Sequence, residues 1–362
     1  MTYAASRAEL AQISIKQDGS NFRYWNKDAN SFKQLTDYVM RITDPKSADF
    51  VPVEDRIAVF DLDGTLISET TPSYFEWMLF LKRALQDPTY TPSPEDKEFA
   101  LQVKRSIYFD GIPNPIEGTG LESSPERKDL KPLESPLKNR SRREAKAQSS
   151  VFVGMTIPEY EAYVKQFMKT PAEGMTNLLR GDSFYLPMVE VISYLHANHF
   201  KVFIVSGTDR QTIRILIDGI LPVESDNVIG TDIWYTASNQ GNADSLTYTY
   251  TKDDNVIRSG FTSKNIKMNK VSKIAREIGK QPILAFGNSS GDDSMFNYTI
   301  YNNKYKALSF ALLCDDTERE LGNDKVAERM RASCAKYGWI PISMKNDFLT
   351  IYGSNVKRAD KK

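Results

Sequence analysis

The chain has 362 residues, and its 47 Lys and Arg residues balance its 47 Asp and Glu residues. Because there is no net basic charge, the composition does not favour a protein that binds nucleic acid through its overall field. Hydrophobic residues make up 40% of the chain, enough for a sizeable core. The length exceeds that of one ordinary compact domain, so we expect a core domain that carries an insertion.

Membrane and export signals are weak. The longest apolar stretches, such as 77–81 and 307–314, are too short to span a bilayer, so no transmembrane segment is expected. The first residues lack a basic region followed by an apolar one. We expect a soluble protein, either cytoplasmic or exported with a signal that this chain no longer carries. Cys314 and Cys334 would then be inert thiols, with a disulfide between them as the alternative in an exported protein.

The N-terminal part leads to the most informative stretch. Residues 1–24 are polar and predict a loosely held arm, and apolar residues at helical spacing predict a helix within 25–42. Residues 57–60 are a short apolar run that predicts a buried strand, and Asp61 and Asp63 follow it directly. Two acids at the end of a buried strand are costly without a partner, and a divalent metal ion is the simplest partner for them.

The segment between residues 68 and 185 is largely helical, which predicts a helical cap inserted after the first strand. Its middle, at about 109–150, is rich in Pro, Ser and charged residues and contains a basic run at 138–143. We expect this middle part to be a solvated, disordered insert, and a docking arm is the alternative.

Strands and helices alternate in the second half of the chain. This order predicts an α/β fold with a doubly wound, Rossmann-like parallel sheet, built from residues 25–67 and 186–350. A small β region is expected within 221–262, where the alternating run 246–251 would turn at 253–255 and pair with 256–257. The remaining strands are expected at 201–205, 282–286, 306–313 and 339–343.

Polar residues gather where these strands end. Ser206 and Gly207 follow one strand, Lys270 begins a helix, and Asn288 and Asp292 lie in the loop after another strand. Ligands of doubly wound sheets bind at the carboxyl ends of the strands, so we expect these groups to share one site with Asp61 and Asp63. His196 and His199 lie at the predicted end of a helix, which leaves acid and base chemistry to the carboxylates.

These groups form a set suited to phosphoryl transfer. Asp61 would be the nucleophile and form an aspartyl-phosphate, and Asp63 would be the general acid and base. Ser206 and the backbone at Gly207 would bind phosphoryl oxygens, and Lys270 would neutralise charge. The expected Mg²⁺ ligands are Asp61, the backbone carbonyl of Asp63, Asn288 and Asp292.

The motifs 61–65, 204–207, 269–271 and 287–292, read in order, resemble the four motifs of the haloacid dehalogenase-like hydrolase superfamily. The resemblance covers roughly residues 50–345, apart from the charged insert, and is greatest to phosphoserine and phosphorylcholine phosphatases. It implies a Mg²⁺-dependent phosphomonoesterase with a helical cap and with the residue roles given above.

The chain departs from this family pattern at two places. Asn288 stands where the fourth motif usually has an Asp, which implies a metal site with less negative charge. Phosphoserine phosphatases have a Glu nine residues after the nucleophile, where this chain has Thr70, and Glu69 comes one residue early. This second departure argues against phosphoserine as the substrate. Asp63 argues against the dehalogenase branch, which does not use the second acid.

The leading hypothesis is therefore a Mg²⁺-dependent phosphatase that hydrolyses a small phosphorylated metabolite. One alternative is a phosphotransferase that passes the phosphoryl group to an alcohol. The other is a catalytically silent binding protein, against which the intact set of Asp61, Asp63, Ser206, Lys270 and Asp292 argues. The sequence leaves the oligomeric state open.

Overall fold

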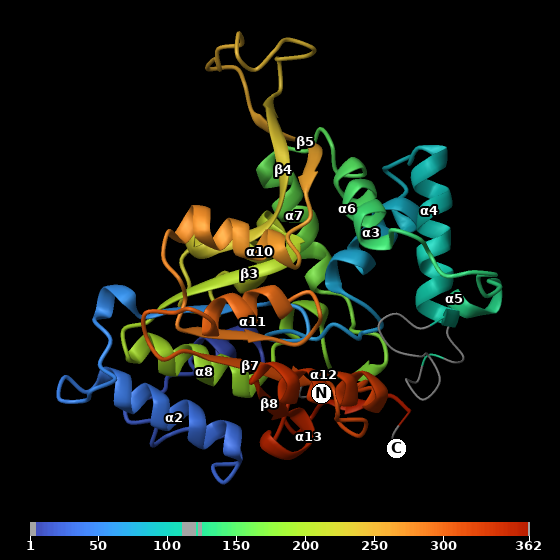
Figure 1. The fold of residues 1–362 in the computed structure, drawn as a ribbon. Helices are drawn as coiled ribbons and strands as arrows, with labels where there is room; N and C mark the ends of the chain where they lie inside the picture. Colours follow the sequence, from blue (N-terminus) through green and yellow to red (C-terminus); the bar gives the residue numbers. More distant parts are fainter. Residues whose placement is uncertain (1–4, 111–120, 122–124, 361–362) are drawn as a thin grey trace.

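A computed structural model describes residues 5–110, 121 and 125–360 (Figure 1). Its centre is a seven-stranded sheet in the order β5-β4-β3-β1-β6-β7-β8. All neighbours are parallel except β4 and β5, which pair antiparallel at one edge, so the predicted α/β fold with a mostly parallel sheet is confirmed. The strands are β1 (Ile57–Phe60), β3 (Lys201–Asp209), β4 (Val228–Ala237), β5 (Val256–Ser263), β6 (Leu284–Gly287), β7 (Leu308–Leu313) and β8 (Ile340–Ser343).

Helices cover both faces of the sheet. This is seen at β1, where all four residues are buried although successive side chains point to opposite faces. Ala58 and Phe60 join the core beneath α2 (Asn30–Thr43), α8 (Leu186–Ala197) and α9 (Arg210–Ile217). Ile57 and Val59 join a second core that includes side chains of α11 (Asp293–Ile300) and α12 (Asp324–Tyr337). The helix α10 (Met268–Lys273) lies beside α11 on this second face (Figure 1).

A helical insertion, whose helices lie between Phe75 and Met168, separates β1 from β3 in the chain. Figure 1 shows its helices gathered to one side of the sheet. They are α3 (Phe75–Gln86), α4 (Pro94–Arg105), α5 (Pro125–Lys128), α6 (Arg140–Ser150) and α7 (Ile157–Met168). A small antiparallel pair, β2 (Met175–Thr176) with β9 (Lys357–Arg358), ties the end of the insertion to the C-terminal segment.

The charged middle of the insertion differs from the expected solvated loop from Arg140 onward, whereas residues 129–139 lie outside helices and strands and are mostly exposed; residues 111–120 and 122–124 lie outside the described part. Helix α6 packs against α3 and β5 and buries Glu144 completely. Its basic residues lie on aromatic rings, with the Arg140 guanidinium 3.6 Å from the centre of the Trp77 ring and Arg143 4.5 Å from that of Phe99. Cation–π contacts and burial of the helix therefore replace the solvation that the composition suggested.

The N-terminal segment also differs from the expected loose arm. From residue 5 onward it lies on the core, where Leu10, Ile15 and Phe22 are buried, and α1 (Arg7–Ala11) begins at a capping box. The Arg7 guanidinium donates hydrogen bonds to the carbonyl oxygens of Gly181 and Leu216. A few well-spaced apolar residues are enough to hold a mostly polar segment in place.

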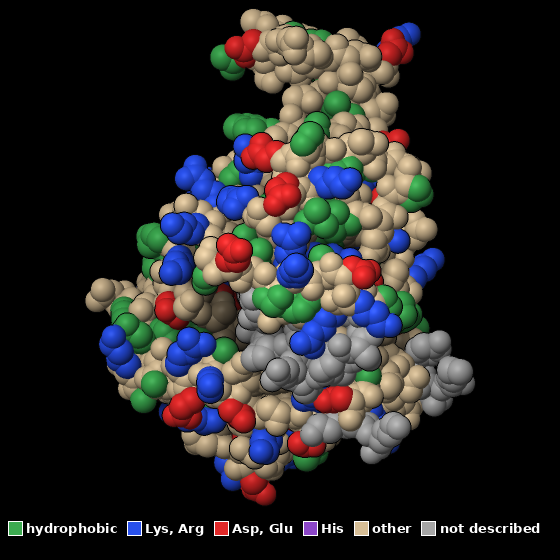
Figure 2. Space-filling view, turned by 90° about the vertical axis from the view of Figure 1, so that its right-hand side faces the viewer, with side chains coloured by type: hydrophobic (Ala, Val, Ile, Leu, Met, Phe, Trp, Pro, Cys, Tyr) green, Lys and Arg blue, Asp and Glu red, His purple; other side chains and the backbone are tan. Residues whose placement is uncertain are grey.

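The β region before α10 is an extension of the main sheet. The hairpin β4–β5 projects from the body and carries an irregular loop that forms a separate lobe in Figure 2. The predicted strand at 246–251 is wrong, because this run lies in the loop, with Leu246 94% exposed. The Asp254 carboxylate organises the loop by accepting hydrogen bonds from the Tyr248 hydroxyl and the Thr251 backbone, and these replace strand pairing.

Three further expectations concern membrane spans, cysteines and histidines. No helix among residues 5–110 and 125–360 is long and apolar enough to cross a membrane. Cys314 and Cys334 are free thiols, and His196 lies in the last turn of α8, as its position in the sequence suggested. The short elements are α13 (Met344–Asp347), the 3₁₀-helices η1 (Val53–Asp55), η3 (Arg180–Asp182) and η4 (Ser225–Asn227), and the π-helices η2 (Ser106–Asp110) and η5 (Ile274–Ile278).

An aromatic stack across the sheet gives a test of the fold. Phe286 of β6 lies between Phe60 of β1 and Phe310 of β7, with ring centroids 4.3 Å and 5.0 Å away. We expect Phe286→Ala to lower the free energy of unfolding by about 3–5 kcal/mol, because it leaves a cavity in the centre of the core. Urea unfolding would measure this loss. The exposed Leu246→Ala control should change stability by less than about 0.5 kcal/mol, and equal effects of the two substitutions would contradict this packing.

Candidate active site

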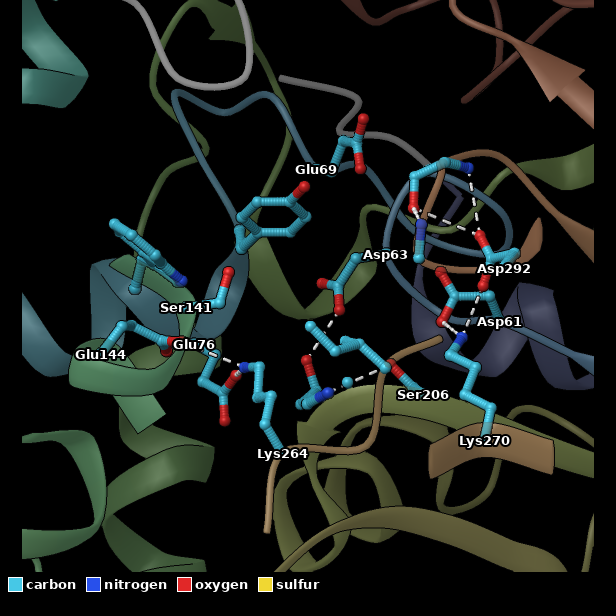
Figure 3. A pocket seen from close by; sticks show the side chains of 17 residues that line it. Asp61, Asp63, Glu69, Glu76, Ser141, Glu144, Ser206, Lys264, Lys270 and Asp292 are labelled. Atoms are coloured by element: carbon cyan, nitrogen blue, oxygen red, sulfur yellow. Dashed lines mark hydrogen bonds and ion pairs between the residues drawn. The ribbon is translucent and has the colours of Figure 1, made fainter. Parts of the chain in front are cut away.

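Most of the sequence-predicted site residues meet in one cavity at the carboxyl ends of the central strands (Figure 3). The strands β3, β1 and β6 are neighbours in the sheet, so loops far apart in sequence converge there. The helical insertion supplies the facing wall through residues at the start of α3 and in α6. The predicted residues that line the cavity are Asp61, Asp63, Ser206, Gly207, Lys270 and Asp292.

Lys270 connects two of the acids. Its Nζ lies 2.6 Å from Asp61 Oδ1 and 2.6 Å from Asp292 Oδ1, and all three side chains are buried. Burial alone would lower the pKa of Lys270, but the charges of Asp292 and Asp61 raise it above its ordinary value. Lys270 therefore stays a cation at neutral pH and partly neutralises the end of β1.

The two acids after β1 differ in their surroundings. Burial, together with repulsion from Asp292, raises the pKa of Asp61 to about 7 against the opposing charge of Lys270. Burial raises the pKa of Asp63 to about 6, and a hydrogen bond from Thr208 opposes this rise. A carboxyl group with a pKa near neutrality can hold a proton and release it at the pH at which an enzyme works.

The C-terminal part of β3, where its pairing with β4 is irregular, forms the next part of the wall. Ser206 is buried beside Asp63, and its Oγ accepts a hydrogen bond from the Thr208 backbone N–H at 3.2 Å. The Asn265 side chain donates to the Ser206 carbonyl oxygen at 3.0 Å and so fixes the backbone of this segment. At Gly207 a Cβ atom would meet Ile266 Cγ2 at 3.0 Å, which favours the smallest residue at this position.

Asn288 does not line the cavity among the described residues; it lies behind the turn that follows β1. A Cβ atom at Gly64, whose φ is +74°, would lie 2.0 Å from Asn288 Nδ2 and 2.7 Å from the Glu69 carboxyl carbon. Glycine is therefore needed there for both conformation and space. The side chains of Asn288 and Glu69 therefore lie against the turn that also carries Asp61 and Asp63.

Glu69 is a cavity residue whose place the sequence did not indicate as functional. It is 8% exposed, and its Oε2 has no hydrogen-bond partner among the described residues. Burial raises the pKa of Glu69 to about 8, with further repulsion from Asp63 and Asp61. It follows shortly after the first motif in the sequence, but only the three-dimensional fold places its carboxyl group against the turn that follows β1.

A second charged cluster, formed by Glu76, Glu144 and Lys264, lies at the other end of the cavity (Figure 3). Lys264 Nζ lies 3.2 Å from Glu76 Oε2 and 3.0 Å from Glu144 Oε2. Glu76 Oε1 also accepts the backbone N–H of Asp209 at 2.8 Å, just after the Ser206 loop. The sequence does not reveal this cluster, because its members come from α3, α6 and the segment before α10 and share no local pattern.

The residues at the end of β1 fit a divalent cation such as Mg²⁺. The described residues that line the cavity include six acids and two lysines, namely Asp61, Asp63, Glu69, Glu76, Glu144 and Asp292 against Lys264 and Lys270. Hard oxygen donors and uncompensated negative charge suit this type of ion. No group of three or more His, Cys, Asp or Glu side chains among the described residues is arranged to hold a metal, so backbone and amide oxygens would have to contribute.

The raised pKa of Glu69 predicts how stability depends on pH without added metal. The ordinary pKa of 4.5 applies to the unfolded chain, so between this value and about 8 the folded protein binds more protons. Stability should fall as the pH rises through this range. We expect Glu69→Gln to reduce this fall in thermal unfolding midpoints measured from pH 5 to 9. The 75% exposed Glu328, changed to Gln, is the control, and an unchanged slope in Glu69→Gln would contradict the prediction.

Comparison with known proteins agrees with this fold. No curated protein matches the chain. A solved structure of a conserved functionally unknown protein from Anaerococcus prevotii DSM 20548 is 14% identical, with a TM-score of 0.50, and the match covers 92% of this chain and 93% of that one. At this identity the likeness shows a shared fold and no more.

Two other solved structures match less well. Cytosolic 5′-nucleotidase IIIB bound to cytidine is 12% identical, with 89% and 88% coverage and a TM-score of 0.46. A phosphoserine phosphohydrolase-like protein from Francisella tularensis subsp. tularensis SCHU S4 is 16% identical, with 71% and 87% coverage and a TM-score of 0.34. The family model of haloacid dehalogenase-like hydrolases matches residues 58–297, which is more than half of the sequence. The chain therefore belongs to the family of haloacid dehalogenase-like hydrolases.

Proposed function

We propose that this protein is a Mg²⁺-dependent phosphatase that hydrolyses a small organic phosphomonoester through an aspartyl-phosphate on Asp61. The observation that carries the proposal is the set of groups around the end of β1. Asp61 lies 2.6 Å from Lys270, and Asp63 and Ser206 line the same cavity. Nucleophile, acid, cation and hydroxyl donor thus face one volume, which is the arrangement that phosphoryl transfer requires.

In the first step Asp61 attacks phosphorus. A bond forms between its carboxylate oxygen and phosphorus, and the bond from phosphorus to the leaving oxygen breaks. Asp63 gives its proton to the leaving oxygen, so the product departs as an alcohol. Lys270 and Ser206 stabilise the negative charge on the phosphoryl oxygens during this transfer.

In the second step water attacks the phosphorus of the aspartyl-phosphate. Asp63, now ionised, takes a proton from this water, and the bond between Asp61 and phosphorus breaks. Phosphate leaves, and both carboxyl groups return to their starting states. The helical insertion contributes Tyr74 and Trp77 to the lining of the cavity in which these steps would take place.

Asp61, Asp292, the backbone carbonyl of Asp63 and Asn288 would hold the cation. When bound, Mg²⁺ supplies positive charge that orients the phosphate and offsets the repulsion among the acids. Asp292 is prepared for this role, because its Oδ2 accepts the backbone N–H groups of Asn288 and Ser289 at 3.1 Å and 3.0 Å. These hydrogen bonds keep its carboxylate in one orientation.

The cavity favours a small substrate. Its volume is about 120 Å³, and Tyr74 and Trp77 line it together with the acids that follow β1. This leaves room for a phosphate group with a short organic part, and it supports a small phosphorylated metabolite as the substrate.

Replacing the nucleophile tests the mechanism. We expect Asp61→Asn to lower the release of phosphate from an aryl phosphate by about 10³-fold or more, because the amide cannot form the covalent intermediate. Released inorganic phosphate would be measured in the presence of Mg²⁺. Asp28→Asn, at a side chain that is 93% exposed, is the control. Equal activities of Asp61→Asn and the wild type would contradict the proposal, and alkyl phosphate formed with added alcohols would instead indicate a phosphotransferase.

The neutral residue at position 288 gives a test of the metal site. A chelator should abolish activity, and Mg²⁺ should restore it. We expect Asn288→Asp to tighten Mg²⁺ binding by about tenfold, because it adds a negative charge at one of the proposed ligands. Calorimetric titration of the metal-free protein with Mg²⁺ would measure this change independently of activity. Unchanged or weaker binding by the variant would place the metal away from Asn288.

A further inference from the structure

The two oxygens of the Asp63 carboxyl group have different surroundings. Oδ2 accepts a hydrogen bond from the Thr208 hydroxyl at 2.7 Å, and both residues are buried. Oδ1 is also buried but has no hydrogen-bond partner among the described residues. Since the side chain lies in the centre of the cavity in Figure 3, this unpaired oxygen is the one left for a ligand.

Thr208 is itself held in place. It lies two residues after Ser206 in β3, and both residues line the cavity. Its backbone N–H donates to Ser206 Oγ at 3.2 Å. Its hydroxyl donates to Asp63, which lies in the loop after the neighbouring strand β1. A β-branched side chain has few rotamers, so Thr208 presents its hydroxyl in a fixed direction.

We propose that Thr208 is a positioning residue that turns Asp63 Oδ1 toward the leaving oxygen of the substrate. This inference rests on the proposed phosphatase activity and adds to it the residue that orients the acid. Because the Thr208 hydroxyl donates to Oδ2, the proton of the neutral Asp63 lies on Oδ1. When the bond from phosphorus to the leaving oxygen breaks, this proton moves to that oxygen, and Oδ1 later takes a proton from the attacking water.

The same contact connects the acid with the phosphate-binding loop. Ser206 and Thr208 belong to one strand, so any shift of this strand that moves Ser206 also moves the donor to Asp63. The distance between the Asp63 carboxyl group and the Ser206 hydroxyl is therefore fixed by β3. A correct distance between them is what transfer of both the phosphoryl group and the proton needs.

The test compares two substrates in Thr208→Val and Thr208→Ser. Valine keeps the branched shape but cannot donate, whereas serine keeps the hydroxyl. An alkyl phosphate needs its leaving oxygen protonated, but p-nitrophenyl phosphate leaves as a stable phenolate. We expect Thr208→Val to lower kcat/KM for the alkyl phosphate by roughly 10- to 100-fold and that for p-nitrophenyl phosphate by less than about threefold. Thr208→Ser should stay within about threefold of the wild type on both substrates.

The thermal unfolding midpoint of each variant shows whether it is folded. Equal losses on both substrates in Thr208→Val, no loss on either, or a Thr208→Ser variant as poor as Thr208→Val would overturn the positioning role. These outcomes differ from failure of the proposed function, which would appear as a wild-type protein that releases no phosphate from either substrate with Mg²⁺ present.

Discussion

The burial of several carboxylates at the end of one strand is the constraint on which the rest of the site depends. Asp61 and Asp63 follow a strand whose residues are all buried, and Asp292 lies opposite them. Like charges at such a place are tolerated only with a close cation. Lys270 supplies it, since it bonds to Asp61 and Asp292 at the same distance of 2.6 Å. The central strands of the sheet and α10 must therefore keep their relative positions for the acids to stay buried.

The same balance of charge recurs at the far end of the cavity. Lys264 lies between Glu76 and Glu144, which come from two different helices of the insertion. Burial alone would lower the pKa of Lys264, but Glu144 and Glu76 raise it. A lysine thus holds the insertion onto the core much as Lys270 holds the loops of the core together. Acids still outnumber lysines among the described lining residues, and this excess suits a site that takes up a metal cation.

The sheet and the residues at its strand ends could be anticipated from sequence, because buried parallel strands are apolar runs and the residues after them are polar. The runs around Ile57–Phe60 and Leu284–Gly287 are of this kind. Contacts set by tertiary packing could not be anticipated. The alternation at 246–251 imitates a strand, but Asp254 turns it into a loop. Glu144 lies in a charged stretch typical of solvated chain, and only its pairing with Lys264 explains its burial. Thr208 gave no signal either, because its partner Asp63 lies 145 positions away in sequence.

Helix α6 carries a consequence for how the cavity could be altered. It forms a wall of the cavity through Ser141 and Glu144, yet its sequence has the low apolar content of a linker. Its inner side is nevertheless buried, from Glu144 to Ser149 except for Lys146, and Ala147 belongs to the hydrophobic core. A substitution at Ser141 would change the wall of the cavity without altering the sheet or the acids that follow β1. The two walls of the cavity thus come from separate parts of the chain, and one can be redesigned without rebuilding the other.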